Sequence, residues 1–210
     1  MMNTLTLNNG IQMPVLGFGT FMMNGSECEE SVLTAIRAGY RMIDTAEAYG
    51  NEEAVGNAII KIGVSNFDPD RLIDLIEFNQ VPPAVDQIET HLLCQRRAER
   101  AWLEKYHVQH MAYAPLGQGR KNEMFENPAL LEIAEAHGKT PAQIALRFLI
   151  QSGVIVIPKS VHEYRIQENF NVFDFELTEK EMDCIRRMDT GIPMIGDPEN
   201  PLKTEAAMKW

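Results

Sequence analysis

The stretch MIDTAEAYGNEEAVG, residues 42–56, decides the fold. Its apolar start predicts a short buried strand. Asn51 and the acidic residues after it predict the start of a helix, because Asn is a good N-cap and acids suit the first turn. Asp44 therefore falls at the carboxyl end of a strand, with Tyr49 on the loop beyond it, and this end is where parallel α/β folds build active sites. A carboxylate and a phenol held there suit proton transfer. The alternative is that Asp44 caps a turn and Tyr49 packs on the helix.

The sequence around this stretch alternates between strand and helix patterns. Asn9-Gly10 between two short apolar segments predicts a β-hairpin, and residues 16–20 predict a strand whose glycines allow close backbone approach. Ser26 with Glu29 predicts a capped helix through Ala38. Further strands are expected over residues 62–67, 84–89, 108–113 and 154–160, and helices over 51–61, from 68, over 95–105 and 128–137, from 141 and from 179. This alternation predicts a parallel α/β fold.

Polar residues follow two of the expected strands. Ser65 and Asn66 end one of them, and an Asn side chain offers both the donor and the acceptor that an amide ligand requires. The alternative is a turn with a helix cap. Lys159, Ser160 and Arg165 gather positive charge and a hydroxyl at the end of another strand and the start of the next helix. Such a group can hold a phosphate by charge-assisted hydrogen bonds. The alternative is that the two basic residues are exposed on the surface and bind no ligand.

Several motifs resemble one known family and occur in its order along almost the whole chain. They are Asp-Thr-Ala-x-x-Tyr-Gly-Asn-Glu (44–52), Gly-Val-Ser-Asn-Phe (63–67), Ala-Tyr-Ala-Pro-Leu-Gly (112–117), and Ile-Pro-Lys-Ser (157–160) followed by Arg-Ile-x-Glu-Asn (165–169). Together they resemble the aldo-keto reductases of the diketogluconate reductase and prostaglandin F synthase type. The resemblance implies an α/β fold, the (β/α)8 TIM barrel with an N-terminal hairpin. It also implies reduction of aldehydes or ketones by NADPH.

The resemblance also implies a role for individual residues. Tyr49 would donate the proton and Asp44 would support it. Ser65, Asn66 and Gln87 would bind the nicotinamide carboxamide, with Tyr113 stacked on the ring. The 2′-phosphate would lie on Lys159, Ser160 and Arg165, and the adenine on Glu168 and Asn169. The full cofactor set is Gly19, Thr20, Asp44, Ser65, Asn66, Gln87, Tyr113, Leu116, Lys159, Ser160, Arg165, Glu168 and Asn169. His91 is followed by Leu92 where the family often has Pro, so we expect it to be structural or to line the pocket.

The chain departs from the family once, at Lys61-Ile62. The pattern gives six βα units, two before this point and four after it, whereas a barrel of this type has eight and about 250 residues. The family strands that carry a catalytic Lys and a catalytic His are absent. At roughly 30 residues per unit, about 60–70 residues are missing. Lys61 itself has the position of a helix-end residue.

Two explanations of the departure compete: a genuine deletion, or a segment of the protein that is omitted between Lys61 and Ile62. A deletion would leave unpaired strand edges and exposed apolar helix faces, so we favour the omission. The missing residues also leave open a second function, that of a nucleotide-binding but non-catalytic relative such as a shortened isoform or a regulatory subunit.

Composition sets the remaining expectations. The 210 residues, 45% of them hydrophobic, fit a single domain over 1–210 with a sizeable core. A net charge of -11 argues against nucleic acid or anionic membranes as partners. The start of the chain lacks the pattern of a signal peptide, and no apolar run reaches the ~20 residues that span a bilayer. The three scattered cysteines predict neither zinc nor disulfides. We expect a cytoplasmic monomer that acts on a small carbonyl compound and holds no metal.

Overall fold

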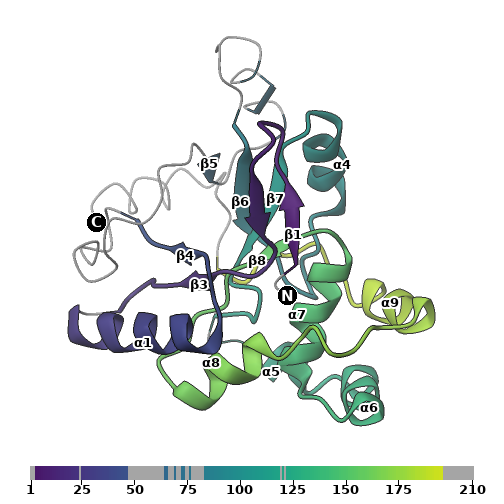
Figure 1. Cartoon of the computed structure of the whole chain (residues 1–210). Coiled ribbons are helices and arrows are strands. Elements are labelled where there is room, and N and C mark those ends of the chain that lie inside the picture. The colour runs from purple at the N-terminus through teal and green to yellow at the C-terminus, as the bar shows by residue number, and fades with distance from the viewer. Residues whose placement is uncertain are drawn as a thin grey trace.

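A computed structural model of the chain describes residues 3–23, 25–46, 64–65, 69, 72–73, 76, 83–118, 120 and 122–195. Strands and helices alternate along most of it (Figure 1). The elements in chain order are β1 (Thr4–Thr6), β2 (Gln12–Pro14), β3 (Phe18–Gly19), α1 (Gly25–Ala38), β4 (Ile43–Asp44), β5 (Val64–Ser65), β6 (Val85–Glu89), α4 (Arg97–Lys105), β7 (Gln109–Tyr113), α5 (Asn122–Phe125), α6 (Pro128–His137), α7 (Pro141–Gln151), β8 (Ile155–Val156), α8 (Glu163–Phe170) and α9 (Glu179–Arg186).

Six of these strands run parallel and follow one another around an incomplete barrel. β5, β6, β7 and β8 form one sheet in that order, and β3 pairs with β4 in a second. A parallel bridge between Leu16 and Val156 joins β8 to the chain just before β3. The order around the wall is therefore β5-β6-β7-β8-β3-β4. Within the described residues β4 and β5 do not pair, so these strands close no barrel.

The β1–β2 hairpin covers the amino-terminal end of the strands. Gly10 has a φ of 78°, which suits the left-handed turn predicted for Asn9-Gly10. Leu7 and Met13 pack in a buried cluster with side chains of the wall: Met42, Ala84, Val85, Met111, Ile155 and Ile157. Asn8 also donates a hydrogen bond to the carbonyl of Pro83, just before β6, at 3.1 Å. Because the hairpin occupies this end, a site for a small molecule belongs at the carboxyl ends.

Helices lie on the outside of the strands, and most begin where the sequence predicts. Thr140 and Thr178 each form a capping box, with Gln143 and Glu181 respectively. α6 occupies residues 128–137, as predicted. The prediction for Ser26 was wrong: α1 begins at Gly25, so Ser26 lies inside the first turn and is not the N-cap. The predicted helix over 51–61 lies outside the described residues.

The largest buried cluster joins the outer helices to the wall. α7 contributes most of its length to this cluster, including Ile144, Leu146 and Leu149. α1 packs against α8. The contact beside Gly39 is so close that an added Cβ would lie 2.6 Å from the Phe170 ring. None of the helices in the described part of the chain has the length and apolar character needed to cross a bilayer.

Candidate active site and cofactor-binding surface

Asp44 is held at the carboxyl end of β4 by contacts from two other strands. The backbone N–H and the hydroxyl of Thr20 both donate to the carbonyl of Asp44, at 3.1 and 2.8 Å. Across the interior, Nε2 of Gln87 on β6 donates to Oδ1 of Asp44 at 2.9 Å. The structure therefore brings together three of the predicted residues, from β4, β6 and the end of β3.

The electrostatic surroundings of Asp44 differ from those that the resemblance implies. Burial raises the pKa of the Asp44 carboxyl, and the hydrogen bond from Gln87 only partly opposes this rise. Among the described residues no Lys or Arg forms an ion pair with Asp44. The donor that faces it is a neutral amide. A neutral donor does not supply the positive charge that lowers the pKa of a neighbouring phenol.

The predicted nicotinamide wall lies on β5, β6 and β7. Ser65 is in register with Gln87, and Glu89 with Tyr113, so these positions line neighbouring strands near their carboxyl ends. Tyr113 is half-buried against the interior cluster. Asn66 and Tyr49 lie outside the described residues, so their roles stay predictions.

The chain turns sharply after β7. Ala114 has a φ of 49°, in the region that favours glycine, and Gly117 has a φ of 76°. The N–H of Gly117 donates to the carbonyl of Ala114 at 2.9 Å. Leu116 lies inside this turn and packs, partly buried, on the main core. The turn thus places Leu116 directly beyond Tyr113, the residue that ends β7.

β3 and the end of β8 approach each other very closely at Gly19. A Cβ at this position would lie only 3.0 Å from the carbonyl oxygen of Ile157. Lys159 and Ser160 follow immediately. Ser160 is buried, and its Oγ accepts a hydrogen bond from the N–H of His162 at 3.2 Å, which orders the turn into α8. Gly19, Lys159 and Ser160 are therefore neighbours, as the prediction requires.

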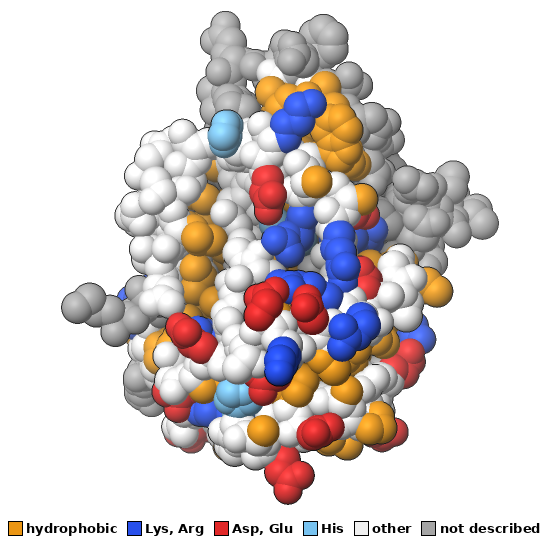
Figure 2. Space-filling model, turned by 90° about the vertical axis from the view of Figure 1, so that its right-hand side faces the viewer, with side chains coloured by type: hydrophobic (Ala, Val, Ile, Leu, Met, Phe, Trp, Pro, Cys, Tyr) orange, Lys and Arg blue, Asp and Glu red, His pale blue; other side chains and the backbone are white. Residues whose placement is uncertain are grey.

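Lys159 and Arg165 are among the basic residues that form no ion pair within the described part of the chain. Both are exposed, and in the described part of the chain neither has a carboxylate within ion-pair distance. Six arginines do pair with acids: residues 96, 97, 100, 120, 147 and 186. Figure 2 shows basic and acidic side chains mixed on one face of the molecule. In a chain of net charge -11, two exposed cations without acidic partners suit an anionic ligand.

The two residues predicted at the adenine lie one turn further along α8. Oε1 of Glu168 accepts a hydrogen bond from the Thr140 hydroxyl at 2.7 Å, so one carboxylate oxygen is already engaged by the cap of α7. Asn169 is only 4% exposed. Both lie on the same helix as Arg165, and their role at the adenine stays a prediction.

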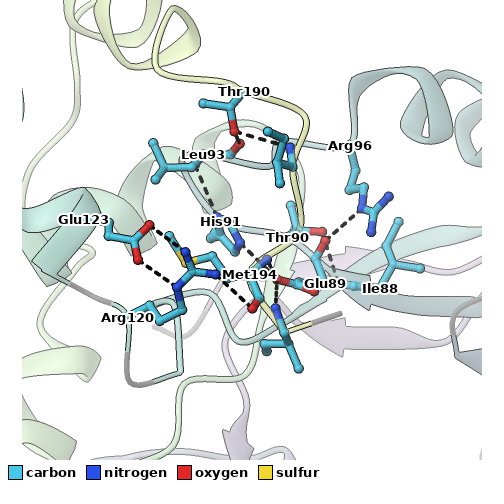
Figure 3. Close-up of polar contacts among 12 residues, drawn as sticks. Ile88, Glu89, Thr90, His91, Leu93, Arg96, Arg120, Glu123, Thr190 and Met194 are labelled. Carbon is cyan, nitrogen blue, oxygen red and sulfur yellow. Dashed lines mark hydrogen bonds and ion pairs between the residues drawn. The ribbon is translucent and has the colours of Figure 1, made fainter. Parts of the chain in front are cut away.

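Sequence reasoning missed Glu89, which no prediction named. Its side chain is fully buried at the end of β6, and its Oε1 accepts from Nε2 of His91 at 3.1 Å and from the N–H groups of Met194 and Ile195 at 2.5 and 2.9 Å (Figure 3). A Glu and a His two positions apart at a strand end is the signal that would have pointed to this pair. His91 is structural in this arrangement.

Comparison with known proteins defines the class. The sequence model of the aldo/keto reductase family matches residues 15–61 and 58–190. The chain belongs to the aldo-keto reductase family. It is 33% identical to a 9,11-endoperoxide prostaglandin H2 reductase of Trypanosoma cruzi (strain CL Brener), over an alignment that covers 94% of this chain and 95% of that protein.

Solved structures agree with this assignment. The fold is similar to that of MGS-M4, an aldo-keto reductase from a Medee basin deep-sea metagenome library, with a TM-score of 0.88, 30% identity, and coverage of 94% of this chain and 99% of that one. It is also similar to a mutant of Gox0644 in complex with NADPH, with a TM-score of 0.87, 27% identity, and coverage of 96% and 98%. These neighbours imply the (β/α)8 barrel as the parent fold.

The comparisons also bear on the departure at Lys61. The alignment with the T. cruzi reductase is 270 residues long, 60 more than the 210 residues of this chain. The two family matches meet within residues 58–61. The two residues of the join lie outside the described part, so the distance between their Cα atoms stays untested and the domain boundary stays a proposal.

Proposed function

We propose that this chain binds NADPH and reduces aldehydes or ketones to alcohols, with Tyr49 as the proton donor and Asp44 as its supporting carboxylate. One observation carries the proposal. Thr20, Asp44 and Gln87, from three separate strands, meet at the carboxyl end of the wall. The family membership and the NADPH complex of a structural neighbour support the choice of reaction and cofactor.

The residues present fit the cofactor at both of its ends. Lys159 and Arg165 supply exposed positive charge without acidic partners, which suits the 2′-phosphate. Beside Lys159, Gly19 carries no side chain, and its backbone lies close to the carbonyl oxygen of Ile157. At the other end the hydrogen bond to Asp44 holds Gln87 at the carboxyl end of the strands, and an amide side chain there suits the carboxamide of the nicotinamide.

When bound, NADPH would supply the hydride for the carbonyl carbon. The protein supplies the proton, which passes from the Tyr49 hydroxyl to the carbonyl oxygen, so that the product is an alcohol. A phenol has an ordinary pKa near ~10 and stays protonated at neutral pH. In the described part of the chain the side-chain donor to Asp44 is the neutral amide of Gln87, which does not make a neighbouring phenol more acidic. With this donor alone we expect slow turnover.

The experiment compares Tyr49→Phe with the unaltered chain. NADPH oxidation with a generic aldehyde is followed together with NADPH binding. Loss of a general acid costs about 100- to 10,000-fold in rate, while the affinity for NADPH should stay nearly unchanged. Undiminished turnover in the variant would remove Tyr49 from the mechanism. Unaltered chain that binds NADPH but never oxidises it would establish the non-catalytic relative instead.

A further inference from the structure

Residues 189–195, the segment that follows α9, contact the end of β6 through one buried carboxylate, that of Glu89. We propose that Glu89 and His91 form an anchor that positions this segment over the carboxyl end of β6, on the substrate side of the site. Only the link between this segment and the substrate rests on the proposed function. The attachment itself is independent of any activity.

The position of Glu89 follows from the strand. Side chains alternate along β6, so Glu89 faces the same side as Gln87, which reaches Asp44 across the interior. Glu89 is one step nearer the carboxyl end. A backbone segment that hydrogen-bonds to Glu89 must therefore lie over the mouth of the wall.

The contacts of Glu89 are those of a structural anchor. One oxygen accepts three N–H groups, from His91 and from the consecutive amides of Met194 and Ile195. Burying a carboxylate is costly unless it is hydrogen-bonded, and bonds to a charged acceptor are stronger than neutral ones. Burial raises the pKa of Glu89, but the hydrogen bonds from His91, Ile195 and Met194 outweigh it and leave the pKa below its usual value. The group is thus held as the carboxylate that the amides require.

His91 is fixed in the orientation that the anchor needs. Its Nδ1 accepts a hydrogen bond from the N–H of Leu93 at 3.3 Å, so Nε2 carries the hydrogen that it donates to Glu89. Both side chains are fully buried. The pair is therefore preorganised by the loop after β6 and does not depend on the segment that it holds.

Other contacts set the path of the segment across the wall. The N–H and hydroxyl of Thr190 donate to the carbonyl of Leu93 at 2.9 and 2.7 Å. Beyond β7, Arg120 donates to the carbonyl of Met194 at 3.2 Å while it pairs with Glu123 (Figure 3). The segment thus runs from the loop after β6 to the loop after β7.

The segment presents apolar side chains at this edge. Ile192 is 68% exposed and Ile195 is 39% exposed. Lys159 follows β8 and Arg165 lies on α8, on a different part of the wall. Release of the segment should therefore change the contacts available to a carbonyl substrate while the phosphate end keeps its geometry.

The test compares Glu89→Ala and Glu89→Gln with a matched control, Glu181→Gln. Glu181 also accepts from a histidine, His137, and from a backbone N–H, that of Thr178, but it holds no part of the segment. Hydrogen exchange is measured at the amides of Met194 and Ile195, with the KM for an aldehyde and the Kd for NADPH. In Glu89→Ala we expect exchange to quicken by about tenfold or more. Glu89→Gln keeps one acceptor oxygen and should show a smaller increase, and the control none.

In Glu89→Ala we also expect KM to rise severalfold and the Kd for NADPH to stay within about twofold. The anchor would be overturned if these two amides are unprotected in the unaltered chain. It would also be overturned if they exchange at the same rate in Glu89→Ala as in the unaltered chain. Faster exchange with an unchanged KM would overturn its role in substrate positioning. If Glu89→Ala does not fold, the same measurements of exchange, KM and Kd on Glu89→Gln and on the unaltered chain test the anchor. A chain that reduces no aldehyde defeats the proposed function, yet the exchange data still decide the anchor.

Discussion

The two ends of the proposed cofactor site differ in what surrounds their charged groups. At the β8–α8 end, Lys159 and Arg165 are exposed cations without acidic partners, next to a buried Ser160 and a capped turn. At the β4 end, Asp44 is a half-buried acid whose described side-chain donor is a neutral amide. The positive charge of the first end suits a phosphate. At the second end no Lys or Arg of the described residues pairs with Asp44, so we expect binding and catalysis to respond separately to change.

The largest effect should come from completing the β4 end. The test inserts between Lys61 and Ile62 a segment of about 60–70 residues, two βα units, that carries the Lys and the His that the resemblance implies. We expect turnover to rise by about 100- to 10,000-fold, because a positioned acid of lowered pKa then acts on an oriented carbonyl. NADPH affinity should change little. The control is the same insert with that Lys and that His changed to Ala. An equal gain with both inserts would show that the segment acts through folding alone.

A smaller and opposite effect should come from weakening the β8–α8 end. Arg165→Ala should lower the affinity for NADPH by about ten- to a hundredfold, the value of one charge-assisted contact, and leave NADH almost unaffected. Arg187→Ala is the matched control, because Arg187 is another exposed arginine without an ion pair in the described residues. Calorimetric titration of both cofactors measures the difference. Equal weakening of NADPH and NADH would rule out the phosphate assignment.

The smallest effect concerns stability at Asp44. Its pKa is raised above the ordinary 3.8 by burial, so its contribution to stability is present below that pH and is lost as pH rises through the raised value. Asp44→Asn keeps an oxygen for Gln87 and carries no charge. The variant should match the unaltered chain near pH ~3 and be the more stable of the two near pH ~7. Urea unfolding at both pH values measures this. A variant less stable at neutral pH would mean that a cation faces Asp44.

Local signals predicted much of the fold. The Asn9-Gly10 hairpin, the strand predicted over 84–89 and the helix starts at Thr140 and Thr178 depend on signals within a few residues, and each was confirmed. The contacts that build the site are not local. Asp44 meets Gln87 across 43 positions, and Glu89 meets Ile195 across 106. Neither hydrophobic periodicity nor a helix cap indicates contacts between residues so far apart in the sequence. The family resemblance therefore predicted Gln87, whereas nothing predicted Glu89.

The central claim is that Lys159, Ser160 and Arg165 form a site for the 2′-phosphate of NADPH in this chain. Titration of the unaltered chain with NADPH and with NADH tests this claim most directly, because it needs neither turnover nor a substrate. We predict saturable binding at one site, with NADPH bound at least about tenfold more tightly than NADH. Equal affinities for the two cofactors, or no saturable binding of NADPH, would contradict the claim.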